Sequence, residues 1–171
     1  MGKVYKVMLL GDIGVGKTSL VRRLIFDSFD HDYKATIGVD VYTHNFMLET
    51  AHGRVPVREL IWDIDGDFGE SIFKQVYIKG ATAALVIGDC SRKATLSSVV
   101  NLAQMFLEEF PGRPVALVAN KTDLVNDEER RPLLAPLNVL SLPIVETSAK
   151  TGSNVRDSFE SIAGMSYERG L

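Results

Sequence analysis

The sequence predicts an α/β fold, in which helices cover both faces of a mostly parallel six-stranded sheet with one antiparallel edge strand. Short β-branched or aliphatic runs alternate along the chain with segments whose apolar residues recur at helical spacing, as in parallel sheets. A glycine-rich connector, Gly11 to Thr18, joins the first apolar run to the first helical segment. We expect residues 1–171 to form one domain, because 171 residues suffice for one buried core.

The composition limits the classes of protein that this chain can represent. Hydrophobic residues make up 46% and charged residues 24%, which is typical of an ordinary globular domain. The net charge of -3 gives no broad basic field, so we expect no nucleic-acid partner. The single cysteine, Cys90, is expected to be a small packing residue, and it is compatible with a cytoplasmic location.

Membrane attachment is not expected from this sequence. No apolar run approaches the length of about 18 residues that a membrane-spanning helix requires. The chain ends at Leu171 without a cysteine for prenylation, and Lys6 stands where a myristoylation pattern has Ser or Thr. We therefore expect no lipid anchor on this chain, and peripheral association only through a partner or through a tail outside this sequence.

The first elements form a strand, a loop and a helix. Val4 to Leu10 predicts a buried strand, and Lys17 to Phe26 predicts a helix. The connector between them has the spacing of Gly, four residues and Gly-Lys-Thr, which is typical of the phosphate-binding loop (P-loop) of P-loop NTPases. Its glycines let the backbone wrap around phosphates, while N–H groups and the helix N-terminus supply positive potential.

The P-loop carries two expected contacts to a nucleotide. Lys17 should reach the β and γ phosphates, and the Thr18 hydroxyl should ligate Mg²⁺. The loop alone does not decide which nucleotide binds. The nucleotide-binding residues that we expect in and after the loop are Asp12, Ile13, Gly14, Val15, Gly16, Lys17, Thr18 and Ser19.

The next two strands are expected to form an antiparallel hairpin. Ala51-His52-Gly53 predicts a turn between the run Val39 to Leu48 and the strand Val57 to Trp62. The alternation that predicts the first of these strands is carried by Val39, Val41, Phe46 and Leu48. The histidines show no metal-ligand spacing and are expected to be ordinary surface or loop residues: His31, His44 and His52.

The remaining elements alternate between strands and helices. Helical spacing predicts helices at Ala94 to Phe110 and Val155 to Met165. A short helix is expected between residues 126 and 142, where Pro132 and Pro136 should interrupt any longer one and charged residues form a solvated surface. The last three strands are predicted at Ala83 to Ile87, Val115 to Ala119 and Pro143 to Val145.

Polar motifs follow the last two predicted strands. Asn120-Lys121-Thr122-Asp123 and Glu146-Thr147-Ser148-Ala149-Lys150 both start where a strand ends, on the side where open α/β sheets bind ligands. Guanine offers an N1–H and an exocyclic amino group as paired donors, and the Asp123 carboxylate can accept from both. Adenine presents no such pair, which argues against an ATPase or a kinase on a related fold.

With these motifs in this order the chain resembles the Ras superfamily of small GTPases, from about Lys3 to Met165. The resemblance implies that GTP or GDP binds with Mg²⁺, that Asp123 reads guanine, that Asn120 braces the surrounding loops and that Lys121 lies along the base. On the same ground Ala149 meets the guanine oxygen through its backbone, and the rest of the base and ribose pocket comes from Ser148 and Lys150.

Within the superfamily the chain looks most like the Rab branch. The segments Thr36-Ile37-Gly38-Val39-Asp40 and Tyr77-Ile78-Lys79-Gly80-Ala81 carry this similarity. Val41 stands where Rab proteins usually have Phe, and the Rab-type cysteine tail is absent, so the chain is described as Rab-like.

The resemblance also assigns the two switch segments, through which protein effectors and regulators would bind. In switch I, Phe29 packs edgewise over guanine, Tyr33 closes over the phosphates and Thr36 joins the Mg²⁺ shell when a γ phosphate is present. In switch II, Asp63 holds Mg²⁺ through water and the Gly66 N–H senses the γ phosphate. The residues expected to act in catalysis are Lys17, Thr36, Gly66 and Asp67.

Switch II departs from the family pattern of Asp-Thr-Ala-Gly-Gln. Asp67 replaces the glutamine that orients the attacking water, and Asp65 replaces an alanine beside the phosphates. An ionised carboxylate cannot donate to water and opposes the negative charge that develops on the phosphoryl group, so we expect slow hydrolysis. Ile13 adds to this, because a β-branched side chain on the P-loop can obstruct an arginine supplied by an activating protein.

Two roles in switch II stay open at this point. Asp65 could ligate Mg²⁺, weaken γ phosphate binding by repulsion or point to solvent, and Asp67 could be swung out while another residue supports hydrolysis. The leading hypothesis is a GTP-hydrolysing molecular switch with low intrinsic activity. The alternative is a non-enzymatic module that binds GTP or GDP for interaction with other proteins, a pseudo-GTPase.

Overall fold

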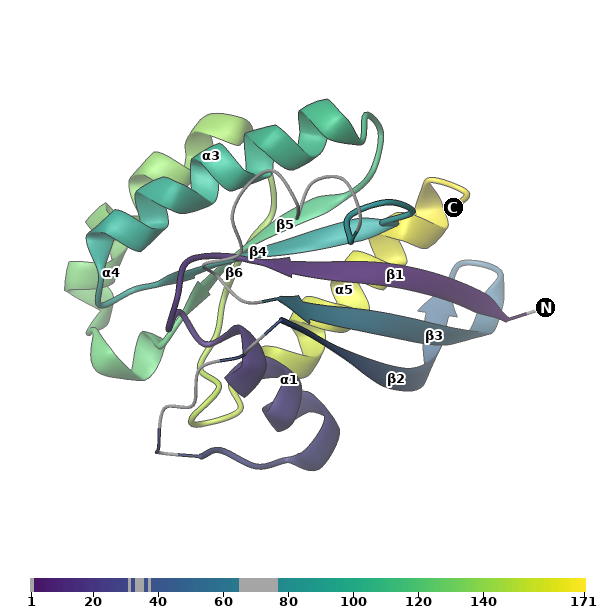
Figure 1. Ribbon diagram of the computed structural model, residues 1–171, viewed down its shortest axis with the longest axis horizontal. Helices are drawn as coiled ribbons and strands as arrows, with labels where there is room; N and C mark the ends of the chain where they lie inside the picture. The colour runs from purple at the N-terminus through teal and green to yellow at the C-terminus, as the bar shows by residue number, and fades with distance from the viewer. Residues whose placement is uncertain (1, 31, 33–35, 37, 65–76) are drawn as a thin grey trace.

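A computed structural model describes residues 2–30, 32, 36, 38–64 and 77–171 of the chain. Its sheet has the strand order β2-β3-β1-β4-β5-β6, with helices on both sides (Figure 1). Strands β2 and β3 run antiparallel and every other neighbouring pair runs parallel, which confirms the expected α/β fold with one antiparallel edge strand. The strands are β1 (Lys3–Leu10), β2 (Val39–Thr50), β3 (Gly53–Ile64), β4 (Ala83–Asp89), β5 (Val115–Asn120) and β6 (Ile144–Glu146).

Helices cover the sheet in two layers, each with its own apolar cluster. One cluster joins β1 and β3 to α1 (Lys17–Phe26) and α5 (Val155–Glu168). The other joins the opposite face to α3 (Lys93–Glu109), α4 (Asp127–Leu134) and the 3₁₀ turn η2 (Ala135–Leu140), and Figure 1 shows the two layers on opposite sides. A second 3₁₀ turn, η1 (Thr122–Leu124), follows β5. Every residue of β4 and β5 is buried, as parallel strands covered on both faces require.

The β2–β3 hairpin extends further than the sequence predicts at its turn. Pairing continues to Thr50 and Gly53, and Arg54 forms an ion pair of 2.7 Å with Glu49 beside the turn. The polar residues here pair through their backbone while their side chains stay in solvent, so hydrophobic alternation does not reveal the strand ends.

The alternation predicted along β2 does not continue from Val41 to Phe46, because these two residues lie on opposite faces of the strand. Pairing between β2 and β3 runs without a bulge, so positions 42, 44, 46 and 48 share one face. Phe46 and Leu48 pack on the cluster with α1 and α5, whereas Val39 packs on the other cluster and Val41 is 50% exposed. The expected residues therefore belong to two faces of the strand.

The same register determines the position of His44. The expectation that His44 lies on the surface is wrong. Its side chain faces the core, is 6% exposed, and places Nδ1 3.0 Å from Oε2 of Glu59, which is completely buried. Burial raises the pKa of the Glu59 carboxyl to about 7, against the lowering effect of His44. His52 lies in the exposed turn as expected, and His31 lies outside the described residues.

Helix α4 confirms the expected short helix but tolerates a proline. Pro132 lies inside α4 instead of ending it, and Pro136 lies in the first turn of η2. The Asn126 side chain accepts from the Glu129 N–H and caps the helix. With only eight residues, α4 loses one backbone hydrogen bond at Pro132.

Cys90 lies in the core as a packing residue, which confirms the expectation. Its side chain is buried beside β4, and burial raises the pKa of its thiol to about 11. Among the helices that the structure describes, none combines the length and the apolar character needed to cross a bilayer.

Candidate functional site

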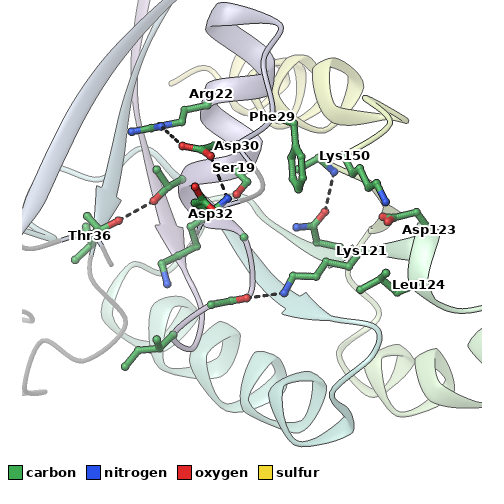
Figure 2. A pocket seen from close by; sticks show the side chains of 18 residues that line it. Ser19, Arg22, Phe29, Asp30, Asp32, Thr36, Lys121, Asp123, Leu124 and Lys150 are labelled. Carbon is green, nitrogen blue, oxygen red and sulfur yellow. Dashed lines mark hydrogen bonds and ion pairs between the residues drawn. The ribbon is translucent and has the colours of Figure 1, made fainter. Parts of the chain in front are cut away.

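A pocket of about 360 Å³ opens at the carboxyl ends of β1 and β5, where the P-loop and the polar motifs meet. This is the edge at which parallel α/β sheets bind ligands, and the volume is in the range of a small-molecule site. Figure 2 shows Phe29, Lys121, Asp123 and Lys150 at one end and Thr36 at the other. The pocket is lined by Ile13, Gly14, Gly16, Lys17, Thr18, Ser19, Arg22, Phe29, Asp30, Asp32, Thr36, Ile64, Asn120, Lys121, Asp123, Leu124, Ala149 and Lys150.

The P-loop keeps its shape because Gly16 packs directly against the base-side motif. Gly16 has φ 103°, a left-handed conformation, and a Cβ atom there would lie 2.3 Å from Nδ2 of Asn120. The ammonium of Lys17, only 7% exposed, donates to the carbonyls of Gly11 at 2.8 Å and Asp12 at 3.1 Å. Lys17 therefore lies across the concave side of the loop, at the place expected for phosphate oxygens.

Three side-chain oxygens converge beside Lys17. The Thr18 hydroxyl donates to Asp63 Oδ2 at 2.5 Å and lies 2.7 Å from the Thr36 hydroxyl. The other Asp63 oxygen, Oδ1, is buried and has no hydrogen-bond partner among the described residues. Burial raises the pKa of the Asp63 carboxyl, against the lowering effects of the Thr18 hydrogen bond and of Lys17.

This oxygen cluster fits a magnesium ion. Mg²⁺ prefers one or two carboxylate or hydroxyl ligands from protein and completes its shell with water and phosphate. An unpartnered buried carboxylate oxygen beside two hydroxyls supplies these ligands, and a bound cation would also favour the charged form of Asp63. The residues predicted for the metal thus lie together.

The base end of the pocket is built around Asn120, which is buried. Its Nδ2 donates to the Val15 carbonyl at 2.9 Å, while its Oδ1 accepts from the Thr147 hydroxyl and the Ala149 N–H. One side chain therefore connects the P-loop to the loop after β6. Asp123 accepts from the Ser148 hydroxyl at 2.6 Å through Oδ1.

Most of the residues that the sequence predicts for the site line this pocket. Val15 and Asp63 are predicted site residues that lie buried behind its wall. The predicted residues Asp12 and Ser148 also lie outside the lining but contact Lys17 and Asp123. Four residues of the switch predictions lie outside the described residues: Tyr33, Asp65, Gly66 and Asp67.

Arg23 and Asp89 are important to the site but absent from the prediction. Arg23 on α1 donates to the carbonyls of Ala149 at 2.9 Å and Lys150 at 2.7 Å. Asp89 ends β4, is 1% exposed and forms an ion pair of 2.7 Å with Lys121. A polar residue at the end of a buried parallel strand is the signal that could have identified Asp89, as it identified Asn120.

Asp89 is a stable negative charge inside the protein. Burial raises the pKa of its carboxyl, but hydrogen bonds from Lys121, Ser91 and Arg92 outweigh burial and hold that pKa below its usual value. Lys121 in turn donates to the carbonyl of Gly14 in the P-loop at 2.7 Å. Asp89 therefore fixes a cation that contacts the phosphate loop.

Comparisons with known proteins agree with this geometry. The sequence profile of the Ras family matches residues 6–167 of the chain. The GTP-binding protein ypt3 of Schizosaccharomyces pombe is 32% identical over 165 residues, which cover 93% of this chain and 74% of the relative.

Proposed function

Because the chain belongs to the Ras family of small GTPases, we propose that it is a Rab-like molecular switch that hydrolyses GTP to GDP slowly with Mg²⁺. The family implies guanine-nucleotide binding. The observation that carries the finer proposal is the convergence of the oxygens of Thr18, Thr36 and Asp63 beside the Lys17 ammonium. A Mg²⁺ ion held by these oxygens beside the Lys17 ammonium would suit the phosphates of a nucleoside triphosphate.

In this proposal each end of the pocket has a separate task. Lys17 and the P-loop N–H groups would hold the phosphates, and Thr18, Thr36 and Asp63 would hold Mg²⁺, whose charge would offset that of the phosphate oxygens. Asp123 accepts from the guanine donors, with Ser148 orienting its carboxylate. Phe29 and Lys121 flank the base, and the backbone of Ala149 faces the guanine oxygen.

Two residues support slow hydrolysis, Asp67 by its place in the sequence motif and Ile13 by its position on the P-loop. Asp67 lacks the N–H donor of a glutamine, and its charge opposes that of the phosphoryl group. Ile13 lines the pocket and is 46% exposed, so its branched side chain would obstruct an arginine supplied by another protein. Effectors and regulators would read the switch segments in the bound states.

A single-turnover measurement tests the slow rate. Asp67→Gln should speed hydrolysis of bound GTP by about tenfold or more, because it restores an amide that can orient water. Asp157→Gln, the same change at an exposed position of α5, is the matched control and should leave the rate unchanged. Wild-type hydrolysis as fast as that of Asp67→Gln would contradict the carboxylate argument.

A second candidate function is a non-enzymatic module that binds GTP or GDP. The carboxylates of Asp65 and Asp67 in switch II favour it. If bound nucleotide serves only to maintain a binding surface, GTP should copurify intact, or GDP should remain bound without measurable exchange. Identification of the copurifying nucleotide by chromatography separates this possibility from a cycling switch.

Base selectivity can be tested at Asp123. Its Oδ1 accepts from Ser148, and pairing with guanine requires a carboxylate that accepts at both oxygens. Asp123→Asn replaces one acceptor with a donor and should lower the preference for GDP over ATP in displacement of labelled GDP. An unchanged preference for GDP over ATP would contradict the role of Asp123 and would favour an ATPase.

A further inference from the structure

Three consecutive carbonyl groups of the P-loop each accept from a different side chain. The Ile13 carbonyl accepts from Arg92 NH2 at 2.9 Å, and the Gly14 carbonyl accepts from Lys121 Nζ at 2.7 Å. The Val15 carbonyl accepts from Asn120 Nδ2 at 2.9 Å. The donors are Arg92, which follows β4, Asn120, which ends β5, and Lys121, which follows β5.

Each of these hydrogen bonds also orients an N–H group. In a trans peptide unit the carbonyl and the next N–H lie in one plane and point in opposite directions. When Ile13 presents its carbonyl to Arg92, the N–H of Gly14 must point to the other side, toward the inside of the loop. Lys121 and Asn120 do the same for the N–H groups of Val15 and Gly16. Such aligned N–H groups form an anion-binding concavity.

Arg92 is held firmly in its position. Its Nε donates to Asp89 Oδ2 at 3.0 Å, and the same oxygen forms the ion pair with Lys121. The backbone of Arg92 precedes α3, where its N–H donates to the Asp89 carbonyl and its carbonyl accepts from Thr95. The guanidinium is a planar fork, so one end can grip the Asp89 carboxylate while the other reaches the P-loop.

We propose that Arg92 is a positioning residue for phosphate binding, which holds the Ile13–Gly14 peptide unit so that its N–H faces the nucleotide. Arg92 acts through the backbone and does not line the pocket. The inference rests on the proposed nucleotide-dependent function and adds a support for the P-loop that the sequence motifs do not contain.

The rate of release of fluorescent methylanthraniloyl-GDP from the full chain tests this role. Arg92→Ala should speed release by about tenfold, the effect of losing one hydrogen bond to a charged group. Lys93→Ala is the matched control, because Lys93 is the next residue, is exposed and carries the same charge. Its release rate should equal that of wild type.

Arg92→Lys separates positioning from a general effect of charge. Lysine keeps the positive charge but has one ammonium in place of a fork, so it cannot grip Asp89 and Ile13 in the same way. Release from this variant should fall between wild type and Arg92→Ala. A field effect alone would give a wild-type rate for Arg92→Lys, and that result would overturn the proposal.

Two further measurements complete the test. Arg92→Ala also removes one donor from the buried Asp89 carboxylate, so its urea midpoint should fall below that of Lys93→Ala. Release is therefore compared without urea, where the unfolding curves show both variants to be fully folded, so that faster release reports the loop and not unfolding. Release from Arg92→Ala at the wild-type rate would overturn the inference alone. The proposed slow hydrolysis is read separately, from phosphate formation, and fails independently of GDP release.

Discussion

Asp89 and Glu59 are two buried carboxyl groups in one sheet with opposite electrostatic surroundings. Asp89 lies at the carboxyl end of β4 and accepts from Lys121, Arg92 and Ser91, so its pKa is low despite burial. Glu59 lies within β3, has His44 as its partner and leaves Oε1 without a hydrogen bond among the described residues. Its pKa rises to about 7.

The difference between the two regions lies in the number and charge of the donors. At the carboxyl end of β4, two cationic side chains and a backbone N–H meet the single carboxylate of Asp89, which fixes its charge in place. The hairpin region buries Glu59 with too few donors to hold its charge, so this carboxyl group changes its charge near neutral pH. A buried carboxyl group is a fixed charge only where several donors meet it.

Two glycines with nearly the same backbone conformation give the sharpest contrast between these regions. Gly16 has φ 103° and lies against Asn120, whereas Gly53 has φ 107° and no atom within 4 Å of an added Cβ. Gly16→Ala should weaken GDP binding by about 100-fold or more, because the loop must shift from its binding geometry.

Gly53→Ala serves as the control for backbone strain. It should cost about 1 kcal/mol of stability, as a non-glycine residue does in this region, and should leave GDP affinity unchanged. GDP titration and urea unfolding measure both quantities. Equal losses of affinity in the two variants would show that strain, and not the contact with Asn120, controls the P-loop.

The pH dependence of stability should separate the two carboxyl groups. Glu59 has its pKa raised from 4.5 to about 7, so its contribution is complete at low pH and is lost as the pH rises through about 7. As the pH rises from 4.5 to about 7, the free energy of unfolding of wild type should therefore fall by about 3 kcal/mol relative to that of Glu59→Gln.

Urea unfolding at a series of pH values measures this difference. Glu49→Gln, an exposed position on the same hairpin, should follow the wild-type curve. A constant difference between wild type and Glu59→Gln from acid to neutral pH would contradict a raised pKa at Glu59.

Asp89 should show the opposite sign. Because its pKa is lowered in the folded state, its contribution is complete above the ordinary carboxyl pKa and is lost as the pH falls through the folded value. Asp89→Asn should cost about 2 kcal/mol at neutral pH, reduced from the value for a fully buried pair because Lys121 and Arg92 are partly exposed. Exposed Glu109 provides the control Glu109→Gln.

The measurement is again unfolding by urea, now extended to acid pH. The disadvantage of Asp89→Asn should shrink toward acid pH, while GDP affinity falls at neutral pH because Lys121 loses its anchor. If the disadvantage of Asp89→Asn grew toward acid pH, the assignment of Asp89 as a fixed charge would be wrong.

The smallest effect is expected at the tip of the hairpin. Arg54 and Glu49 form an ion pair of 2.7 Å, but both side chains are mostly exposed, so water and salt weaken the pair. Arg54→Ala should change the free energy of unfolding by about 0.5 kcal/mol or less. A larger loss would mean that short contacts stabilise the hairpin even without burial.

The order of elements could be predicted because it depends on local patterns. The P-loop and the Asn120–Asp123 motif are each continuous in sequence, so their residue types and spacing indicate their chemistry directly. The short helix α4 was expected, although its Pro132 was not expected inside it. The family match over residues 6–167 confirms the resemblance that these motifs carry.

The supports of the site could not be predicted in the same way, because they depend on which strands are neighbours. Arg92 meets Ile13 only because β4 lies beside β1, and His44 meets Glu59 only because of the hairpin register. The alternation along β2 does not show which of its residues face the core; the continuous pairing places His44 there and leaves Val41 half exposed.

Arg23 connects the two ends of the pocket mechanically. It projects from the helix that begins with Lys17 and holds the carbonyls of Ala149 and Lys150, on the segment that carries Ser148. A displacement of α1 by a partner bound to the phosphate side would therefore move the base side as well. Contacts to the phosphates and contacts to the base would then weaken together. Displacement of this one helix would favour release of the whole nucleotide.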